Sequence, residues 1–387
     1  MAEWKNYTLE EVCERIYSGG TPSTKHEEYW NGDIKWLSSG ETSQRFVYDT
    51  ERKITKRGVE NSATKLATKG CTVVATAGQG YTRGQASFLM TDTYMNQSVI
   101  ACKANENVIL PLYLYYNLDS RYEEFRLLSD GTSTRGGLSG WILKRMEIKL
   151  PPKSLQKKIV DILYSIDRKI EENNAINNNL EQQAQAIYQQ IFIDNVSSDW
   201  TEGTLSDIAD ITMGQSPSGS SYNEDSNGTI FFQGRAEFGF RFPTVRLYTT
   251  EPKRMACAND TLMSVRAPVG DLNVAHIDCC IGRGIAAIHS KNNHQSFVLY
   301  TMFSLKKQLD VFNGEGTVFG SINRKSLNEM PILIPSSEKL DEFEALVAPM
   351  DAAIHNNYDE ICRLEQLRDS LLPQLMSGEL DVSDIDL

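Results

Sequence analysis

Arginine, amide and hydroxyl side chains gather in glycine-rich stretches of this sequence, where they could donate hydrogen bonds to a nucleic acid. An arginine can donate two bonds to one guanine, an asparagine or glutamine can pair with adenine, and a glycine lets the backbone approach a phosphate. The residues that we expect to contact DNA are Gln79, Tyr81, Arg83, Thr132, Ser133, Arg135, Arg235, Arg266, Arg283, Thr317, Asn323, Arg324 and Lys325. Any single one of them is as readily an ordinary loop residue. The prediction depends on the whole set, because both halves of the chain place polar loops at matching points.

Sequence motifs for catalysis and metal binding are absent. No Walker loop, Gly-x-Ser-x-Gly, His-Glu-x-x-His or dinucleotide fingerprint occurs. The glycine-rich run Gly78–Gly84 lacks the Lys-Ser/Thr of a phosphate-binding loop, and Glu123 and Glu124 fit a solvated helix face. Among the seven cysteines no pair has the two-residue spacing of a zinc site, and Cys279 and Cys280 fit buried positions. We therefore predict no active site, no metal and no cofactor.

Charge is distributed unevenly along the chain. The formal net charge is −12, yet residues 338–387 alone have 13 acidic and 3 basic side chains, a net of −10. The other parts are close to neutral, so each can present a local basic face to DNA. The start of the chain forms no apolar run, and no later segment approaches about 18 apolar residues in succession. We therefore expect a cytoplasmic protein.

A heptad repeat of apolar residues runs from Leu155 to Phe192 and recurs near the C-terminus, where Phe343 stands at the position of Ile159. Its a and d positions are Ile159, Leu163, Ile166, Ile170, Asn173, Asn177, Leu180, Ala184, Ile187 and Ile191, then Phe343, Val347, Met350, Ile354, Asn357, Ile361, Leu364, Arg368, Leu371 and Leu375 in the second copy. This period predicts two long helices that pack together. Asn173 and Asn357 share one a position, which predicts a buried polar pair that fixes the register. Pro349 and Pro373 occur only in the second copy and predict a kink and a frayed end.

The duplication includes the globular segment before each helix. Turns at Ser18–Ser23 and Met213–Ser218 are followed by short β-type runs and by one helical segment in each copy. Each copy is therefore predicted to be a mixed α/β (α+β) domain. We place the domains at residues 1–153 and 196–337, one long helix at 154–195, and the other at 338–387 together with an acidic tail. The second domain lies between the helices in the sequence, so we expect the helices to run antiparallel.

Several apolar residues of the helices lie outside the strict heptad seam. They are Ile162, Ile176, Tyr188 and Phe192 on the first helix and Leu346, Leu367 and Leu372 on the second. They could contact helices of a partner protein, or they could widen the apolar stripe that packs within the chain. The sequence leaves both interpretations open.

Several short sequence segments resemble segments of type I restriction-modification specificity (S) subunits. They are Gly214–Ser218, Arg266–Asp271, Gly282–Ala286, Ser321–Leu327 and the terminal Leu371–Glu379. The resemblance covers the whole chain, and the terminal phrase and the two-copy layout are its most specific features. In the first copy, Ala77–Gly80 stands where the second copy has Arg266–Val269.

This resemblance implies two target-recognition domains, each reading one half of a split DNA site, with the two helices between them. It also implies that the helices bind two modification (methyltransferase) subunits and that restriction (motor nuclease) subunits join the complex. In that family the S subunit has no active site, which agrees with the absence of catalytic motifs.

Two other classes of protein remain open. A methyltransferase fused to its own recognition domain would need a cofactor-binding glycine motif and an Asn/Asp-Pro-Pro-aromatic motif, and Leu150–Lys153 is not one. A structural coiled-coil scaffold would account for the helices but not for the duplicated domains. Methyl transfer by the purified chain alone would favour the first class. A lack of DNA affinity, even with the partner present, would favour the second.

Overall fold

A computed structural model of the chain describes residues 3–78, 80–130, 138–314 and 320–385. The contacts within it define two compact units. Unit 1 comprises Met1–Ile170 and Cys362–Leu387, and unit 2 comprises Glu171–Ile361. Each unit therefore combines one globular part with a portion of each long helix. No helix in the described part of the chain is long and apolar enough to span a membrane.

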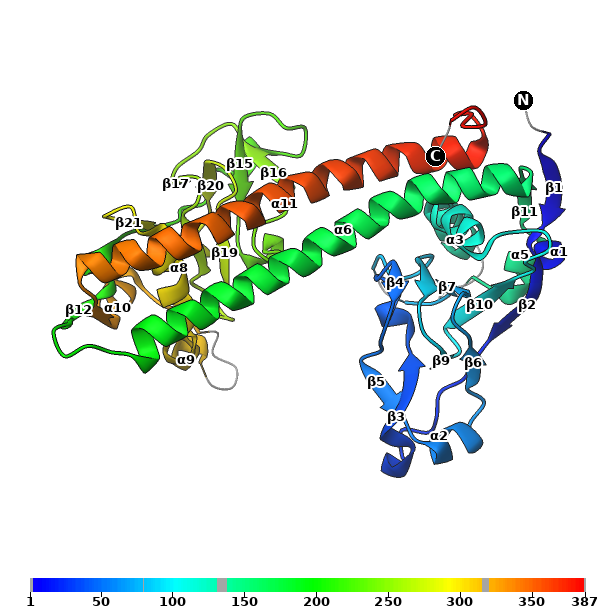
Figure 1. Cartoon of the computed structure of the whole chain (residues 1–387), viewed down its shortest axis with the longest axis horizontal. Coiled ribbons are helices and arrows are strands. Elements are labelled where there is room, and N and C mark those ends of the chain that lie inside the picture. The colour runs from blue at the N-terminus through cyan, green and yellow to red at the C-terminus, as the bar shows by residue number, and fades with distance from the viewer. Residues whose placement is uncertain (1–2, 79, 131–137, 315–319, 386–387) are drawn as a thin grey trace. The chain divides into compact units, whose positions relative to one another are not determined.

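The globular part of unit 1 contains three sheets (Figure 1). The five-stranded sheet has the order β2 (Cys13–Ser18), β10 (Val99–Ala104), β7 (Thr72–Ala75), β8 (Ala86–Leu89) and β4 (Phe46–Val47). The four-stranded sheet has the order β5 (Arg52–Ile54), β3 (Trp30–Leu37), β9 (Thr93–Met95) and β6 (Lys65–Ala67). The first strand, β1 (Lys5–Thr8), pairs antiparallel with the last, β11 (Glu147–Leu150).

Unit 2 repeats this arrangement. Its four-stranded sheet has the order β13 (Ala209–Met213), β21 (Ile285–Ser290), β18 (Thr261–Ser264) and β19 (Leu272–Val274). Its five-stranded sheet has the order β14 (Tyr222–Asn223), β16 (Leu247–Thr249), β15 (Thr229–Phe232), β20 (Cys279–Ile281) and β17 (Met255–Ala256), and β12 (Thr201–Thr204) pairs with β22 (Pro331–Ile334). The order β2-β10-β7-β8 of unit 1 matches β13-β21-β18-β19 strand for strand. The predicted duplication of a mixed α/β domain is confirmed.

Local sequence signals mark the starts of short helices in both units. The helices are α1 (Leu9–Val12), α2 (Lys56–Glu60), α3 (Pro111–Asp119), α4 (Tyr122–Asp130) and α5 (Gly140–Arg145) in unit 1, and α7 (Leu205–Ile208), α8 (Gln295–Ser304), α9 (Lys306–Asp310) and α10 (Arg324–Asn328) in unit 2. Thr8 with Glu11 and Thr204 with Asp207 form capping boxes at α1 and α7. Proline at the first turn suits the start of α3, since that position needs no N–H donor.

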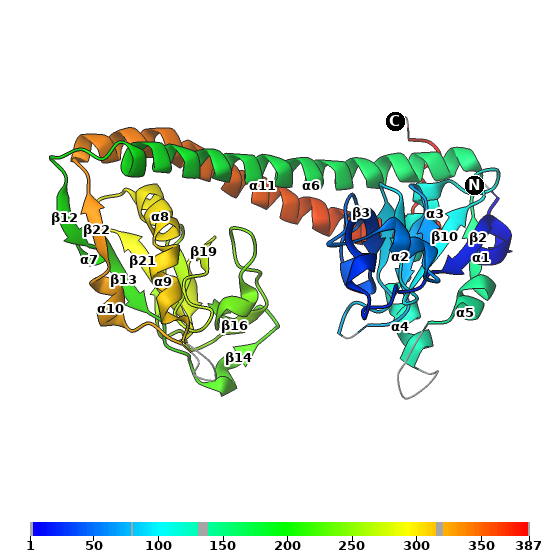
Figure 2. The same cartoon turned by 90° about the horizontal axis from the view of Figure 1, so that it is seen from below.

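In unit 1, α3 lies between the five-stranded sheet and a long helix (Figures 1 and 2). Its residues 113–118 are all buried, as is typical of a helix covered on every side. In unit 2, residues 296–302 of α8 are buried in the same way, in a core shared with both long helices. Each globular part is therefore attached to the long helices through one fully buried helix.

The long helices are α6 (Lys153–Tyr188), which continues in a π-helical turn to Asp194, and α11 (Ser337–Ser377). In unit 1, Leu163 near the start of α6 shares a core with Leu375 near the end of α11. In unit 2, Ala184 near the end of α6 shares a core with Phe343 near the start of α11. The helices therefore run antiparallel, as predicted (Figure 1).

The expected Asn173–Asn357 pair and the expected fraying at Pro373 are wrong, whereas the kink expected near Pro349 stays a prediction. Asn173 Nδ2 donates to Glu360 Oε2 and Asn357 Nδ2 donates to Asn177 Oδ1, both at 2.8 Å, so the two expected partners bind other residues. Helix α11 also continues through Pro349 and Pro373 to Ser377. Each proline removes a backbone N–H donor and its ring crowds the carbonyl four residues earlier, but buried side chains around both prolines, including those of Val347 and Leu375, hold the helix.

Candidate nucleic-acid interface

Three loops of unit 2 meet where strand β18 ends. Val265, the residue after β18, donates its N–H to Gly284 O (2.9 Å) and accepts a bond from Ile322 N–H (3.1 Å). Ala267 N–H donates to Gly320 O (3.0 Å). These backbone bonds bring together the loops that contain Arg266 and Arg283 and the segment that leads into α10, whose first residue is Arg324.

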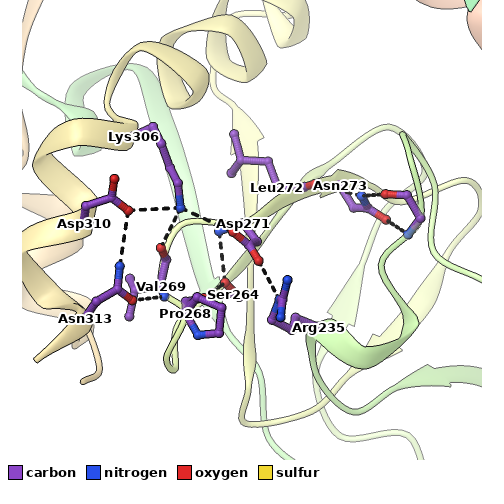
Figure 3. Close-up of polar contacts among 11 residues, drawn as sticks. Arg235, Ser264, Pro268, Val269, Asp271, Leu272, Asn273, Lys306, Asp310 and Asn313 are labelled. Carbon is purple, nitrogen blue, oxygen red and sulfur yellow. Dashed lines mark hydrogen bonds and ion pairs between the residues drawn. The ribbon is translucent and has the colours of Figure 1, made fainter. Parts of the chain in front are cut away.

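The first of these loops, residues 265–271, is braced from within (Figure 3). Ser264 Oγ donates to Pro268 O (2.6 Å) and accepts a bond from Asp271 N–H (3.0 Å). Gly270 has a φ of +83°, and a Cβ there would lie 2.9 Å from Leu309 Cβ. Only glycine fits this position without strain.

Helix α9 and the turn after it brace the same loop from outside. Lys306 Nζ donates to Val269 O (3.1 Å) and lies 3.3 Å from Asp271 Oδ1. Val269 N–H donates to Asn313 Oδ1 (2.5 Å). The loop is thus held in one conformation by groups on both sides, as Figure 3 shows, and binding would require little reordering of it.

The arginines at this site differ in how freely they can bind a ligand. Arg266, Arg283 and Arg324 are exposed, and within the described residues none of their side chains has a hydrogen-bond or ion-pair partner. Arg235 is also exposed, but its Nε lies 2.5 Å from Asp271 Oδ2. Arg235 would therefore have to share its charge between Asp271 and a ligand, whereas the other three would not.

Asn323 and Lys325 have structural partners that the sequence did not reveal. Asn323 Oδ1 accepts the Ser326 N–H (2.9 Å) and caps α10, so its amide oxygen is already bound. Lys325 Nζ lies 3.9 Å from Glu329 Oε1 along the same short helix. Both side chains remain exposed. Asn323 orients the start of the helix from which Arg324 projects.

In unit 1 the matching loop connects β7 and β8. Tyr122 Oη of α4 donates to Tyr81 O (3.0 Å), and Arg126 Nη1 of the same helix donates to Gly80 O (2.7 Å). The Tyr81 side chain is 82% exposed, whereas Arg83 is half-buried. Of these two side chains, Tyr81 is therefore the better placed to reach a ligand.

Five residues predicted to contact DNA lie outside the described residues: Gln79, Thr132, Ser133, Arg135 and Thr317. The sequence analysis also missed the residues that brace the loops, chiefly Tyr122 and Lys306. These two occupy the first positions of α4 and α9, and they are separated by the same offset as Ile159 and Phe343. The offset that revealed the duplicated helices could therefore have identified them.

The apolar helix residues outside the heptad seam fall into two groups. Tyr188, Phe192 and Leu372 are buried in the chain's own core, so for them the expectation of a partner contact is corrected. Ile162 is half-buried against the core of unit 1. The exposed members are Ile176, Leu346 and Leu367, at 46%, 49% and 48%. Of the seven, these three alone present a large apolar surface to solvent.

One group of potential metal ligands occurs among the described residues. Ligand atoms of His276, His355 and Asp359 in unit 2 lie within 4.8 Å of one another. His276 Nε2 and Asp359 Oδ1 already share a hydrogen bond (2.7 Å), and the two imidazoles pack at 4.4 Å beside Phe242. Burial lowers the pKa of His355, the charge of His276 lowers it further, and Asp359 raises it. Hydrogen bonding and ring packing account for this group, and we assign no metal to it.

Cys279 and Cys280 fit the expectation of buried thiols, whereas Cys257 is exposed. Cys279 and Cys280 lie fully buried in β20, and all seven cysteines are free. Burial raises the pKa of the Cys279 thiol to about 12, so that it stays protonated at neutral pH. His289, which is near these cysteines in the sequence, binds Asp260 instead.

Comparisons with known proteins identify the family of the chain. The family described as "Type I restriction modification DNA specificity domain" matches residues 1–182 and 197–358. A relative named "Putative type I restriction enzyme MjaX specificity subunit", from Methanocaldococcus jannaschii, is 30% identical over 77% of this chain and 74% of its own length. The HindI specificity subunit of Haemophilus influenzae is 21% identical over 98% of this chain and all of its own length.

A solved structure has a similar fold. It is the S subunit of a type I restriction-modification system from M. genitalium, with a TM-score of 0.63 and 17% identity, and the match covers 97% of this chain and 96% of that one. At this identity the match concerns the fold alone. With two copies of the matched domain, one in each globular part, and with relatives aligned over most of their length, the chain belongs to the family of type I restriction-modification specificity subunits.

Proposed function

We propose that each globular part of this chain reads one half of a bipartite DNA site, and that the chain itself catalyses no reaction. The observation that carries the proposal is that backbone bonds in unit 2 join the loops of Arg266 and Arg283 to the segment before α10, which begins with Arg324. Exposed guanidinium groups without internal partners can bind guanine edges or phosphates at little cost. In unit 1, Tyr81 on the matching loop supports a second reading face.

Positive and negative side chains both lie at the loop of unit 2, which favours sequence-specific recognition over binding to any DNA. Asp271 neutralises part of the charge of Arg235 and Lys306. A wrong base that cannot satisfy the remaining arginines leaves them desolvated and unpaired, which is a source of specificity. Phosphate contacts would set affinity and its salt dependence, and base contacts would set the sequence.

We further propose that Ile176, Leu346 and Leu367 contact the modification (methyltransferase) subunits, and that restriction subunits join the same complex in the cytoplasm. Their exposure on α6 and α11 supports this assignment, because large exposed apolar side chains often mark protein interfaces. The long helices would then both separate the reading domains and hold the catalytic subunits.

The test is the methylated motif in cells that express the complex with Arg266→Ala, Arg283→Ala or Arg324→Ala. At a base-reading arginine we expect a loss of about 1–3 kcal/mol in binding and relaxed bases in one half-site only. At a phosphate-binding arginine we expect weaker binding to all sequences alike.

Lys291→Ala is the matched control. It removes an exposed cation directly after the far end of β21, eight residues from Arg283, or roughly 26 Å along an extended chain. It should leave the motif unchanged. The proposal is wrong if all three arginine variants keep the wild-type motif and affinity. Methyl transfer by the purified chain alone would instead indicate an enzyme.

A further inference from the structure

A buried polar group in unit 2 joins the globular part to α11. Arg241 Nη2 donates to Tyr300 Oη and to Asp351 Oδ1, and Tyr300 Oη donates to the same Asp351 oxygen, all three at 2.9 Å. Arg241 precedes β16, Tyr300 lies on α8 and Asp351 lies on α11. Burial raises the pKa of Tyr300, although the Arg241 charge lowers it. The Tyr300 hydroxyl therefore stays protonated and can donate its hydrogen bond to Asp351.

Unit 1 brings the same three residue types together around an aspartate, although Arg45 does not repeat the bond of Arg241 to the tyrosine hydroxyl within the described residues. Tyr116 Oη of α3 donates to Asp167 Oδ2 of α6 (2.8 Å), and Arg45 Nε lies 3.2 Å from Asp167 Oδ1. Tyr300 follows Tyr116, and Asp351 follows Asp167, at the offset that relates the two copies of the heptad repeat. Arg45 and Arg241 are each followed by a buried phenylalanine. The two triads are therefore copies of one arrangement.

Each arginine also binds the strand that leaves the recognition loop. Phe88 N–H of β8 donates to Arg45 O, and Val274 N–H of β19 donates to Arg241 O, both at 2.8 Å. β8 follows the loop that contains Tyr81, and β19 follows the loop that contains Arg266. In each unit the arginine thus links two parts of the structure. Its side chain binds the long helix, and its backbone carbonyl binds the strand that follows the recognition loop.

The chemistry of the triads favours an orienting role over a stabilising one. Apolar packing is not directional, and the surrounding core already supplies it. Burying charged groups costs desolvation energy that well-packed apolar residues would avoid. A guanidinium bound to a carboxylate, however, fixes angles as well as distance. Such a contact prevents the globular part from tilting on the helix.

We propose that Arg45–Tyr116–Asp167 and Arg241–Tyr300–Asp351 are positioning triads that fix the angle of each recognition domain on the long helices, and so make the complex accept one gap length between half-sites. This inference rests on the proposed function. It assigns the choice of gap to residues that lie away from the loops expected to contact DNA.

The test uses the assembled methyltransferase complex with Tyr116→Phe, Tyr300→Phe, Asp167→Asn or Asp351→Asn. Substrates have both half-sites intact and the gap either native, one base pair shorter or one base pair longer. We expect the preference for the native gap to fall roughly tenfold in each variant, the scale of a lost hydrogen bond to a charged group. The half-site bases should not change.

Tyr113→Phe is the matched control. The Tyr113 hydroxyl is buried in the same helix as Tyr116 and has no hydrogen-bond partner among the described residues. Phe297 stands at the equivalent position of the second copy. The control removes the same atom but no contact, so its gap preference should equal that of the wild type.

A merely structural role gives a different result. If the variants melt at lower temperature but keep the wild-type gap preference, the positioning role is wrong. An unchanged preference together with unchanged melting also overturns it. If the wild-type complex itself shows no bipartite motif, the proposed function fails first, and this inference fails with it.

Discussion

The two recognition loops differ in chemistry although the same elements brace them. In unit 1 the first residue of α4, Tyr122, binds a loop carbonyl through its hydroxyl. In unit 2 the first residue of α9, Lys306, binds a loop carbonyl and a carboxylate through its ammonium group. The triad that joins each domain to its long helix consists, by contrast, of the same three residue types in both, an arginine, a tyrosine and an aspartate. The two copies therefore differ in the loops that we expect to read DNA, and they agree in the residue types that attach each domain to the long helices.

The surroundings of the triads differ in their charge balance. In unit 1, Arg368 Nη1 donates to Asp167 Oδ1 (3.1 Å), and Arg45 Nη1 lies 2.9 Å from Asp119 Oδ2, so two cations face two anions. In unit 2, Arg241 faces Asp351 at 2.9 Å and Glu181 at 3.6 Å. Burial raises the pKa of Asp119 and of Glu181, while the arginines lower both. Unit 2 therefore depends on one arginine where unit 1 has two.

The largest effect should come from lengthening both helices at once. We would insert one heptad after Ala175 and another after Asp359, which keeps Asn173 with Glu360 and Asn357 with Asn177. Seven residues add roughly 10.5 Å, close to three base pairs at ~3.4 Å each. Methylation of the native site should be lost and should reappear at the same half-sites with a gap longer by up to about three pairs. The methylome measures both.

The matched control for this change is the same insertion in α6 alone. It separates Asn173 from Glu360 or Asn357 from Asn177, so all methylation should be lost. Three extra base pairs also turn one half-site by roughly 100°, which the DNA or a domain must absorb. An active double insertion with an unchanged gap would show that the helices do not set the spacing.

The second-largest effect should come from removing the arginine of each triad, because the charge balance around it differs between the units. Arg241→Met leaves two buried or half-buried carboxylates without their cation, and we expect a loss of about 3–5 kcal/mol in the free energy of unfolding of unit 2. Arg45→Met should cost unit 1 less, because Arg368 still binds Asp167. Hydrogen exchange in urea, followed separately for amides of each unit, measures the two losses. Equal losses would contradict the comparison.

The smallest effect is a pH dependence confined to unit 2. Burial and the charge of His276 lower the pKa of His355 although Asp359 raises it, so the folded state binds a proton less readily than the unfolded state. Stability should be complete above about pH 6.5 and should fall as the pH drops through the folded pKa. We expect the free energy of unfolding to fall by less than about 1 kcal/mol, because His355 is only half-buried.

Hydrogen exchange of unit 2 between pH 7 and pH 5 tests this prediction, with His355→Gln as the variant that should remove the dependence. The first copy of the heptad repeat has Glu171 at the equivalent sequence position, and unit 1 has a single histidine in its sequence, so it lacks this pair of imidazoles. An equal pH dependence in both units, or its persistence in the variant, would show that other groups are responsible.

The sequence alone determined which residues form the helices and which face they bury. The heptad positions Ile159, Leu163, Phe343 and Val347 are all buried as their spacing predicted, because a period of about 3.5 residues places them on one side of a helix. The duplication likewise predicted two copies of one mixed domain. Periodicity does not determine how far one antiparallel helix is shifted along the other. That is why the expected pair of Asn173 with Asn357 was wrong.

The tertiary structure decided which distant residues meet. Arg266, Arg283 and Arg324 are brought together only by backbone bonds between three loops, and no local pattern in the sequence encodes those bonds. Tyr188 and Phe192 match the pattern of exposed partner contacts as well as that of core residues, and only the packing of α8 and α11 against them buries them. The repeat offset identifies Tyr116 with Tyr300 and Asp167 with Asp351, but the arginine that completes each triad lies far from both in the sequence. Its place depends on the fold of the sheet that carries it.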